Sequence, residues 1–165
     1  MLARIIGVFK LNSQTFEEIE HNTSLTLPAA LIVLIVALIS GLGNGLFNGL
    51  RSGDKTFVGG FISSLVGVIL GWLIWSVVTW FVGTRLFKGQ ADIGEMLRVI
   101  GFAYSPMVLS IIPCIGGIIG LLWALAAGFI AVRQGLDLDN TKAFLTVVVG
   151  AVLYIILTVV LNLII

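Results

Sequence analysis

Few residues in this sequence have the type and spacing that a catalytic or metal-binding site requires. The chain contains one histidine, His21, and one cysteine, Cys114, which lie far apart in the sequence. No zinc site and no base-activated nucleophile can therefore be assembled from neighbouring residues. Asp137 and Asp139 form an Asp-x-Asp pair that could bind a cation, but capping of the following helix explains them more simply. We expect no catalytic residues, no metal and no cofactor, and we do not expect an enzyme.

One polar group lies within an otherwise apolar region. Glu95 and Arg98 are three residues apart, and Tyr104 and Ser105 follow within the next two helical turns. An ionisable side chain in a membrane segment is a functional candidate by default. An ion pair between Glu95 and Arg98, within reach of the lipid headgroups, is the simpler interpretation. The alternative is a polar path for transport, or a site for a lipid headgroup.

These residues must be positioned by membrane helices. Four stretches lack Asp, Glu, Lys, Arg and His, and each exceeds the roughly 20 helical residues that cross a bilayer core. The composition agrees, since 59% of the residues are hydrophobic, 10% are charged and the mean hydropathy is +1.17. The sequence therefore predicts an integral membrane protein in a lipid bilayer. A net charge of +1 argues against nucleic acid as a partner. The four stretches are residues 22–50, 56–84, 99–132 and 143–165.

The third stretch decides the number of spans. It has 34 residues, and Pro113 and Gly117 near its middle are residues that end or break a helix. We expect a hairpin there, with Pro106 as a kink in the helix before it. Asp92 and Glu95 form an Asp-x-x-Glu capping pattern that begins this helix. The predicted fold is an all-α polytopic bundle of five transmembrane helices, Leu27–Phe47, Val58–Leu86, Ile93–Ile112, Ile115–Val132 and Ala143–Ile165.

The basic residues indicate the orientation of this bundle. With five spans, seven of the nine Lys and Arg residues lie on the side of the N-terminus, and only Arg51 and Lys55 lie on the other. Because cytoplasmic loops carry the excess of basic residues, we expect a cytoplasmic N-terminus and an external C-terminus at Ile165. The seven residues are Arg4, Lys10, Arg85, Lys88, Arg98, Arg133 and Lys142.

A short segment precedes the first span. Thr15 and Glu18 form a Thr-x-x-Glu capping box, which predicts a brief helix over residues 16–21 at the membrane surface. We therefore divide the chain into an N-terminal cytoplasmic or interfacial segment, residues 1–24, and a five-span membrane domain, residues 25–165.

Small residues recur at four-residue spacing in three of the predicted spans. Residues four apart share one helix face, where two backbones can approach closely and gain dispersion contacts. Packing within the bundle is the simpler interpretation, and a face for a partner or a second copy is the alternative. The three ladders are Ala37, Gly41, Gly45 and Gly49; Gly59, Ser63, Gly67 and Gly71; and Gly116, Gly120, Ala124 and Gly128.

Several sequence features resemble a known family. The segment Val82–Leu109 contains a Leu-Phe-x-Gly linker and the motif Gly-Phe-Ala-Tyr-Ser-Pro at 101–106, and a hairpin with a proline and two glycines follows it. With the Thr-Phe-Glu-Glu-Ile stretch before the first span, these features are similar to the prokaryotic branch of the Yip domain family, the Ypt/Rab-interacting-protein-like membrane proteins. Phe102 stands where that family often has tyrosine. The resemblance covers essentially the whole chain and implies five spans with a cytoplasmic N-terminus.

The resemblance also bears on function. It implies a membrane helper or scaffold of the prokaryotic cell membrane, in some cases beside an export system. It does not imply a role in membrane traffic, because the long hydrophilic N-terminal region and the Asp-Leu-Tyr-Gly-Pro-like motif of eukaryotic members are not found in this sequence. We expect a non-enzymatic scaffold or accessory subunit that binds another membrane protein, or itself, through glycine-lined faces. The alternative is a small transporter or lipid-translocating protein, with Glu95, Arg98, Tyr104 and Ser105 along its path.

Overall fold

All regular secondary structure in the described residues is helical. The computed structural model describes the backbone of residues 1–52, 54–112 and 115–164, and the side-chain environments of 1–46, 57–112, 115–156 and 159. Pro113 of the predicted hairpin and the packing of Gly49 lie outside these residues. The helices are α1 (Leu2–Phe9), α2 (Ser13–His21), the 3-10 helix η1 (Thr23–Leu25), α3 (Thr26–Ser52), α4 (Asp54–Phe87), α5 (Ile93–Ala103), the 3-10 helix η2 (Ser105–Ile111), α6 (Gly116–Gly135) and α7 (Asn140–Ile164).

The longest helices match a membrane protein in length and composition. Within the described residues, three segments are long and apolar enough to cross a bilayer, namely Thr23–Leu46, Phe57–Phe87 and Gly116–Gly135. A shorter apolar segment, Asn140–Ile156, begins α7. The prediction of an all-helical membrane protein is therefore confirmed.

The predicted third span is not one continuous α-helix. α5 ends at Ala103, and the chain continues as the 3-10 helix η2, with Pro106 in its first turn. Proline lacks an amide hydrogen and disfavours α-helical geometry in the residue before it, so the α-helix stops here. The kink predicted at Pro106 takes the form of this change in helix type.

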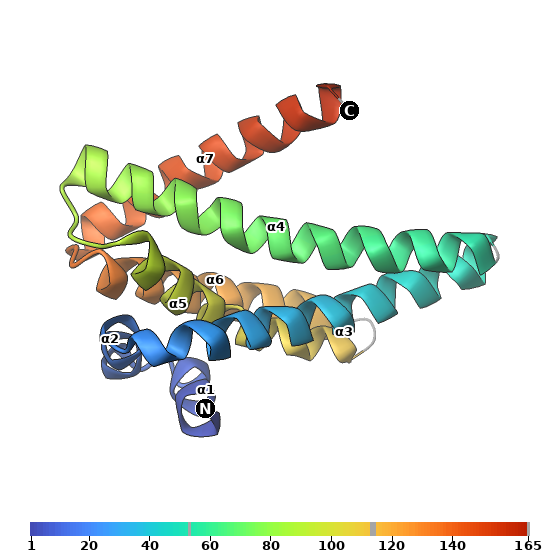
Figure 1. Ribbon diagram of the computed structural model, residues 1–165, viewed down its shortest axis with the longest axis horizontal. Coiled ribbons are helices and arrows are strands. Elements are labelled where there is room, and N and C mark those ends of the chain that lie inside the picture. The colour runs from blue at the N-terminus through green and yellow to red at the C-terminus, as the bar shows by residue number, and fades with distance from the viewer. Residues whose placement is uncertain (53, 113–114, 165) are drawn as a thin grey trace.

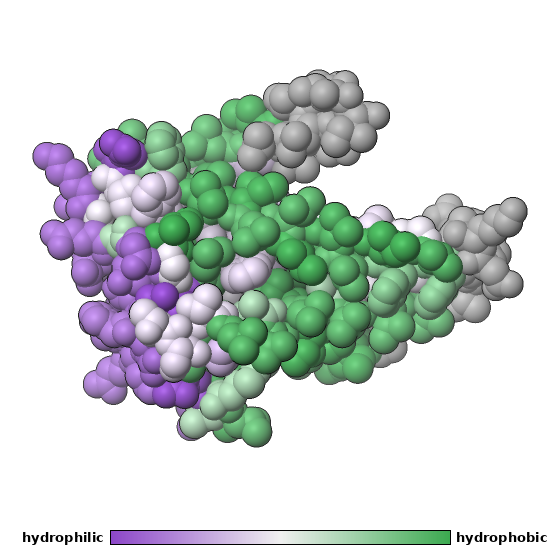
Figure 2. All heavy atoms as spheres, in the orientation of Figure 1, coloured by the Kyte–Doolittle hydropathy of each residue, from purple (hydrophilic) through white to green (hydrophobic). Residues whose placement is uncertain are grey.

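The helices are arranged so that one end of the molecule is polar. α2, the α4–α5 connection and the α6–α7 connection lie together at one end, α1 projects from the bundle near that end, and α7 runs toward the other (Figure 1). Figure 2 shows hydrophilic residues gathered at that first end and a hydrophobic surface along the long sides. Large apolar side chains on these sides, such as Ile62, Leu122 and Val152, are exposed. This distribution is the one expected when lipid covers the sides and water covers the polar end.

Two predicted helix caps are present. In the capping box of α5, Asp92 Oδ1 accepts a hydrogen bond from the Glu95 backbone N–H, and Glu95 Oε2 accepts one from the Asp92 N–H, both at 2.7 Å. Before α7, Asp139 Oδ1 accepts from the Lys142 N–H at 3.0 Å, and this bond lowers the pKa of the Asp139 carboxyl. Capping is therefore the observed role of Asp139.

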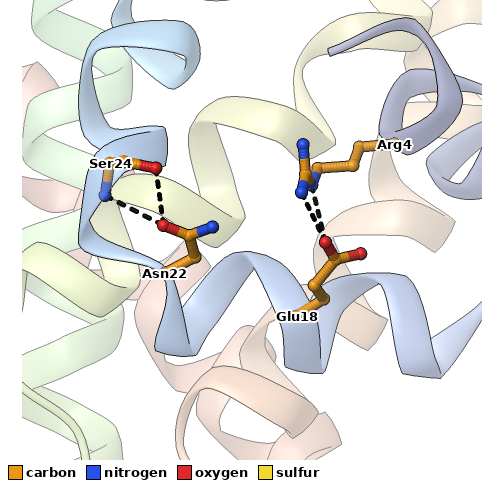
Figure 3. Close-up of polar contacts among 4 residues, drawn as sticks. All are labelled: Arg4, Glu18, Asn22 and Ser24. Carbon is orange, nitrogen blue, oxygen red and sulfur yellow. Dashed lines mark hydrogen bonds and ion pairs between the residues drawn. The ribbon is translucent and has the colours of Figure 1, made fainter.

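The predicted start of α2 is wrong. The helix begins at Ser13, where Asn12 Oδ1 accepts from the Gln14 N–H, and the Glu18 side chain bonds to Arg4 of α1 instead of reaching back to Thr15 (Figure 3). Thr15 packs so closely under Gly7 of α1 that a Cβ on Gly7 would overlap its side chain. Because its side chain packs against α1, Thr15 does not cap α2. At the other end of α2, Asn22 accepts from the Ser24 backbone and hydroxyl (Figure 3).

The N-terminal helices share a core with the bundle. Val8 of α1 and Phe16 and Ile19 of α2 are completely buried, in the same hydrophobic cluster as Met96 and Phe102 of α5. Trp123 of α6 donates from its indole N–H to the Phe9 carbonyl at 2.9 Å, which adds a specific bond to this packing. At the polar end the core therefore extends from the bundle into α1 and α2.

Candidate functional site

Arg98 is buried at the polar end, between α5 and α2. Its side chain is almost completely covered, and its Nε and Nη2 atoms donate to the Glu20 backbone carbonyl at 3.1 and 2.5 Å. That carbonyl is in the last turn of α2, where carbonyl groups lack partners within the helix. A cation at this position also interacts favourably with the helix dipole. Arg98 therefore fastens the C-terminal end of α2 to α5.

The predicted ion pair between Glu95 and Arg98 is wrong. The Glu95 carboxylate is engaged in the capping box with Asp92, while Arg98 turns toward α2. Among the residues with described side chains, the salt bridges join Arg4 to Glu18 and Lys142 to Asp139. The spacing of Glu95 and Arg98 would allow an ion pair. Each side chain instead forms a hydrogen bond with a backbone group that has no other partner in its helix.

Glu20 is a functional candidate that the sequence analysis missed. Its side chain is 3% exposed, and its Oε2 atom has no hydrogen-bond partner within the described part of the chain. Burial of the carboxyl group, with a further contribution from the Asp137 carboxylate, raises the pKa of Glu20 to about 7. A buried carboxylate without a partner is costly, so such groups cluster at sites that bind something.

Two further groups lie beside the Glu20 carboxylate. One ligand atom each from Glu17, Glu20 and His21 lies within 4.8 Å of the others. His21 Nδ1 is 3.0 Å from the Glu17 carbonyl oxygen, and Gln134 Nε2 donates to Glu17 Oε2 at 2.8 Å. The bond to the carbonyl, followed by the Glu20 carboxylate, raises the pKa of His21. The signal in the sequence was the Glu-x-x-Glu-His spacing, which places all three residues on one helix face.

A second feature is an apolar pocket of about 380 Å³ lined by residues of α4, α5, η2, α6 and α7. Gly71 and Trp75 line it from α4, and Tyr104, which follows the last residue of α5, lines it beside Gly71. The other lining residues are Ile100, Ala103, Met107, Leu121, Ala124, Leu125, Gly128, Phe129, Val147, Ala151, Tyr154 and Ile155. The lining is mostly aliphatic and aromatic, as in sites for apolar ligands.

The four residues of the predicted polar path lie in three different places. Glu95 and Arg98 are at the polar end, Tyr104 lines the large apolar pocket, and Ser105 lines a separate pocket of about 100 Å³ beside Ile32 and Val36 of α3. The Ser105 hydroxyl is buried and has no hydrogen-bond partner among the described residues. The structure therefore does not bring these residues together along one path.

Two of the glycine ladders pack inside the bundle. A Cβ on Gly41 would lie 3.0 Å from the Phe61 ring, and one on Gly45 would lie 3.0 Å from the Phe57 carbonyl, so both glycines face α4. Gly116 and Gly120 face η2, where an added Cβ on Gly120 would lie 2.9 Å from the Pro106 carbonyl. These four glycines therefore lie against neighbouring helices of the same chain.

The ladder of α4 is different because much of it is open. Within the part of the chain that the structure describes, Gly59 and Gly67 have no heavy atom within 4 Å of an added Cβ, and Ser63 between them is exposed. Gly71, the last member, is buried and faces the Tyr154 and Tyr104 hydroxyl groups, at 3.3 and 3.7 Å from an added Cβ. Gly128 of α6 is also open, at the wall of the apolar pocket. We refer to Gly59, Ser63 and Gly67 as the open face of α4.

Comparison with known proteins identifies the family. No curated protein and no solved structure matches this chain. A family model described as the Yip1 domain matches residues 6–161. The match includes the second half of α1 and extends well into α7, so it covers both α2, which carries Glu20, and the bundle that carries Arg98. The chain therefore belongs to the Yip1 domain family of membrane proteins.

Proposed function

We propose that this protein is a non-enzymatic scaffold or accessory subunit that binds a transmembrane helix of another membrane protein. The observation that supports this function best is the open face of α4, where an added Cβ on Gly59 or Gly67 would have no heavy atom of the described residues within 4 Å. In lipid, helices associate through close backbone contact and dispersion, and small residues are what permit that contact. The Ser63 hydroxyl already donates to the Gly60 carbonyl at 3.2 Å, so a partner helix can pack there without leaving it unpaired.

A photocrosslinking experiment in native membranes tests this proposal. Leu70 is exposed and lies seven residues after Ser63, on the same side of α4. A photoreactive amino acid at Leu70 should give a protein adduct, whereas the same probe at the exposed Leu122 of α6 should give mainly lipid adducts. The Gly59→Leu/Gly67→Leu variant should lose the protein adduct, because the leucines fill the face without touching the bundle.

The adduct also identifies the partner. Mass spectrometry of the Leu70 adduct should find a second membrane protein, for which a component of an export system is one candidate. An adduct of two copies of this chain would instead indicate self-association. If the probe at Leu70 captures only lipid, in wild type and variant alike, the binding function assigned to this face is wrong.

The apolar pocket favours a second candidate function, the binding or translocation of lipid. The pocket lies among helices whose outer sides face the bilayer, so its natural ligand is an acyl chain. Gly128→Phe should fill the pocket, because nothing lies within 4 Å of an added Cβ there. We expect this variant to retain less co-purified lipid in native mass spectrometry than wild type or Gly117→Phe, which is open but outside the pocket. Equal lipid retention in all three proteins would exclude a lipid site there.

We also propose five membrane crossings in a prokaryotic cell membrane, with a cytoplasmic N-terminus. Support comes from the placement of α2, the α4–α5 connection and the α6–α7 connection at one end of the molecule (Figure 1), because five of the nine basic residues lie in or beside those two connections, and Arg4 and Lys10 precede α2. A reporter fused after Ile165 should be active only outside the cytoplasm. Cytoplasmic activity of that fusion would mean that α5 and η2 do not cross the membrane.

A further inference from the structure

The polar end contains a group of side chains of the types that bind metal ions. This group lies away from both the open face of α4 and the apolar pocket. We propose that Glu17, Glu20 and His21 of α2 bind a divalent transition-metal cation such as Zn²⁺. One ligand atom from each residue lies within 4.8 Å of the others. A tetrahedral ion with bonds of about 2.0–2.2 Å would draw these atoms to about 3.3–3.6 Å from one another, a change that side-chain rotations can supply. All three residues follow one face of a helix, so little backbone rearrangement is needed to bind the ion.

Glu20 supplies the strongest reason for a cation. Its carboxylate is buried with one oxygen unpartnered, and the charged groups that act on it are mostly acidic. The carboxylates of Asp137, in the α6–α7 turn, and of Glu17 and Glu95 add negative charge around it, and His21 is the basic group that opposes them. Arg98 bonds to the backbone carbonyl of Glu20 and not to its carboxylate. A bound cation would partner the free oxygen and offset the excess negative charge.

The other two ligands are already oriented for binding. With the Nδ1–H of His21 donating to the Glu17 carbonyl at 3.0 Å, the lone pair of the ring is on Nε2, where a metal can take it. Gln134 of α6 holds Glu17 Oε2 at 2.8 Å and leaves its other oxygen for the ion. Two carboxylates with one imidazole favour Zn²⁺ or a similar transition metal over Mg²⁺, which prefers oxygen ligands and retained waters. The ion would also link α2 electrostatically to the acidic turn at Asp137.

Equilibrium dialysis against buffered Zn²⁺, followed by elemental analysis, tests the site. The sample is the full chain in detergent at pH 7.5, purified with an affinity tag that contains no histidine. We expect one Zn²⁺ per chain in the wild type. Glu20→Gln should weaken binding at least tenfold, and His21→Asn should do the same. His21 is exposed, so its variant tests the site even if Glu20→Gln impairs folding. A parallel dialysis against Mg²⁺ should show much weaker binding.

Glu18→Gln is the matched control, because Glu18 lies on the same helix but pairs with Arg4 outside the cluster. It should bind Zn²⁺ as the wild type does. Three results would overturn the proposal: no Zn²⁺ retained by the wild type at micromolar free metal, retention unchanged in both Glu20→Gln and His21→Asn, or an equal loss in Glu18→Gln, which would indicate attraction to surface charge. The open face of α4 is far along the chain from this site, so failure here leaves the helix-binding function untouched.

Discussion

Replacing Gly116 by alanine is expected to destabilise the protein by about 3 kcal/mol, whereas the same change at Gly117 should be harmless. An added Cβ on Gly116 would overlap the Leu109 backbone oxygen and lie 2.7 Å from Ile112 Cβ, so η2 and the start of α6 would have to separate. The contact is with backbone, which cannot turn away as a side chain can. An added Cβ on Gly117 would have no heavy atom of the described residues within 4 Å.

The comparison of the two variants separates packing from helix propensity. Alanine favours a helix over glycine by about 1 kcal/mol, so Gly117→Ala should be neutral or slightly stabilising. The free energy of unfolding, measured by titrating the protein from mild detergent into SDS, should fall for Gly116→Ala alone. Equal stability of the two variants would show that η2 and α6 do not pack as the structure has them.

Arg98→Met should destabilise the protein by about 2 kcal/mol and release the C-terminal end of α2. Methionine keeps much of the apolar stem of arginine, but it leaves the Glu20 carbonyl buried without a donor. Because that carbonyl ends α2, the loss should be local. Hydrogen exchange of the amides in residues 13–21 should therefore become faster in the variant, while exchange within α4 should change little.

Two variants, Arg85→Met and Arg98→Lys, provide the controls for this result. Arg85 is exposed on α4, so Arg85→Met removes one positive charge without removing a buried bond and should leave exchange in α2 unchanged. Arg98→Lys should give an intermediate effect, since an ammonium group cannot reproduce the two guanidinium bonds to one carbonyl. If Arg85→Met loosens α2 as much as Arg98→Met, the effect comes from net charge and the anchoring role of Arg98 is wrong.

The surroundings of Gly71 and Gly67 show why the sequence alone could not tell which members of a glycine ladder face another helix. Both residues belong to the same ladder and stand four residues apart, so any pattern treats them alike. In the fold, Gly71 faces the Tyr154 and Tyr104 hydroxyl groups, whereas Gly67 is open. The side of a helix that meets a neighbour depends on how the whole bundle closes. Small-residue spacing predicts close approach, but it does not predict which helix approaches.

Local signals were reliable only where no tertiary contact competes for the same groups. The capping box of Asp92 and Glu95 and the cap at Asp139 depend on groups three residues apart, and both are present. The Thr15–Glu18 box has the same spacing but does not form, because Glu18 pairs with Arg4. The membrane character depends only on the length of apolar runs, which is why it was predictable before any contact was known. The family resemblance was equally visible in the sequence, and the Yip1 domain match over residues 6–161 confirms it.

Contacts between residues far apart in the sequence decided which partners the polar side chains have. Arg98 bonds to Glu20, 78 residues earlier in the chain, and Gln134 bonds to Glu17, 117 residues earlier. No local spacing encodes these partners, so the sequence paired Arg98 with Glu95 and treated His21 as isolated. The sequence by itself determined the membrane environment, the family and the caps at Asp92 and Asp139, because those follow from composition and near neighbours. Only the tertiary structure placed α2 against α5 and α6, and that docking is what buries Glu20 beside His21 and gives the polar end its chemistry.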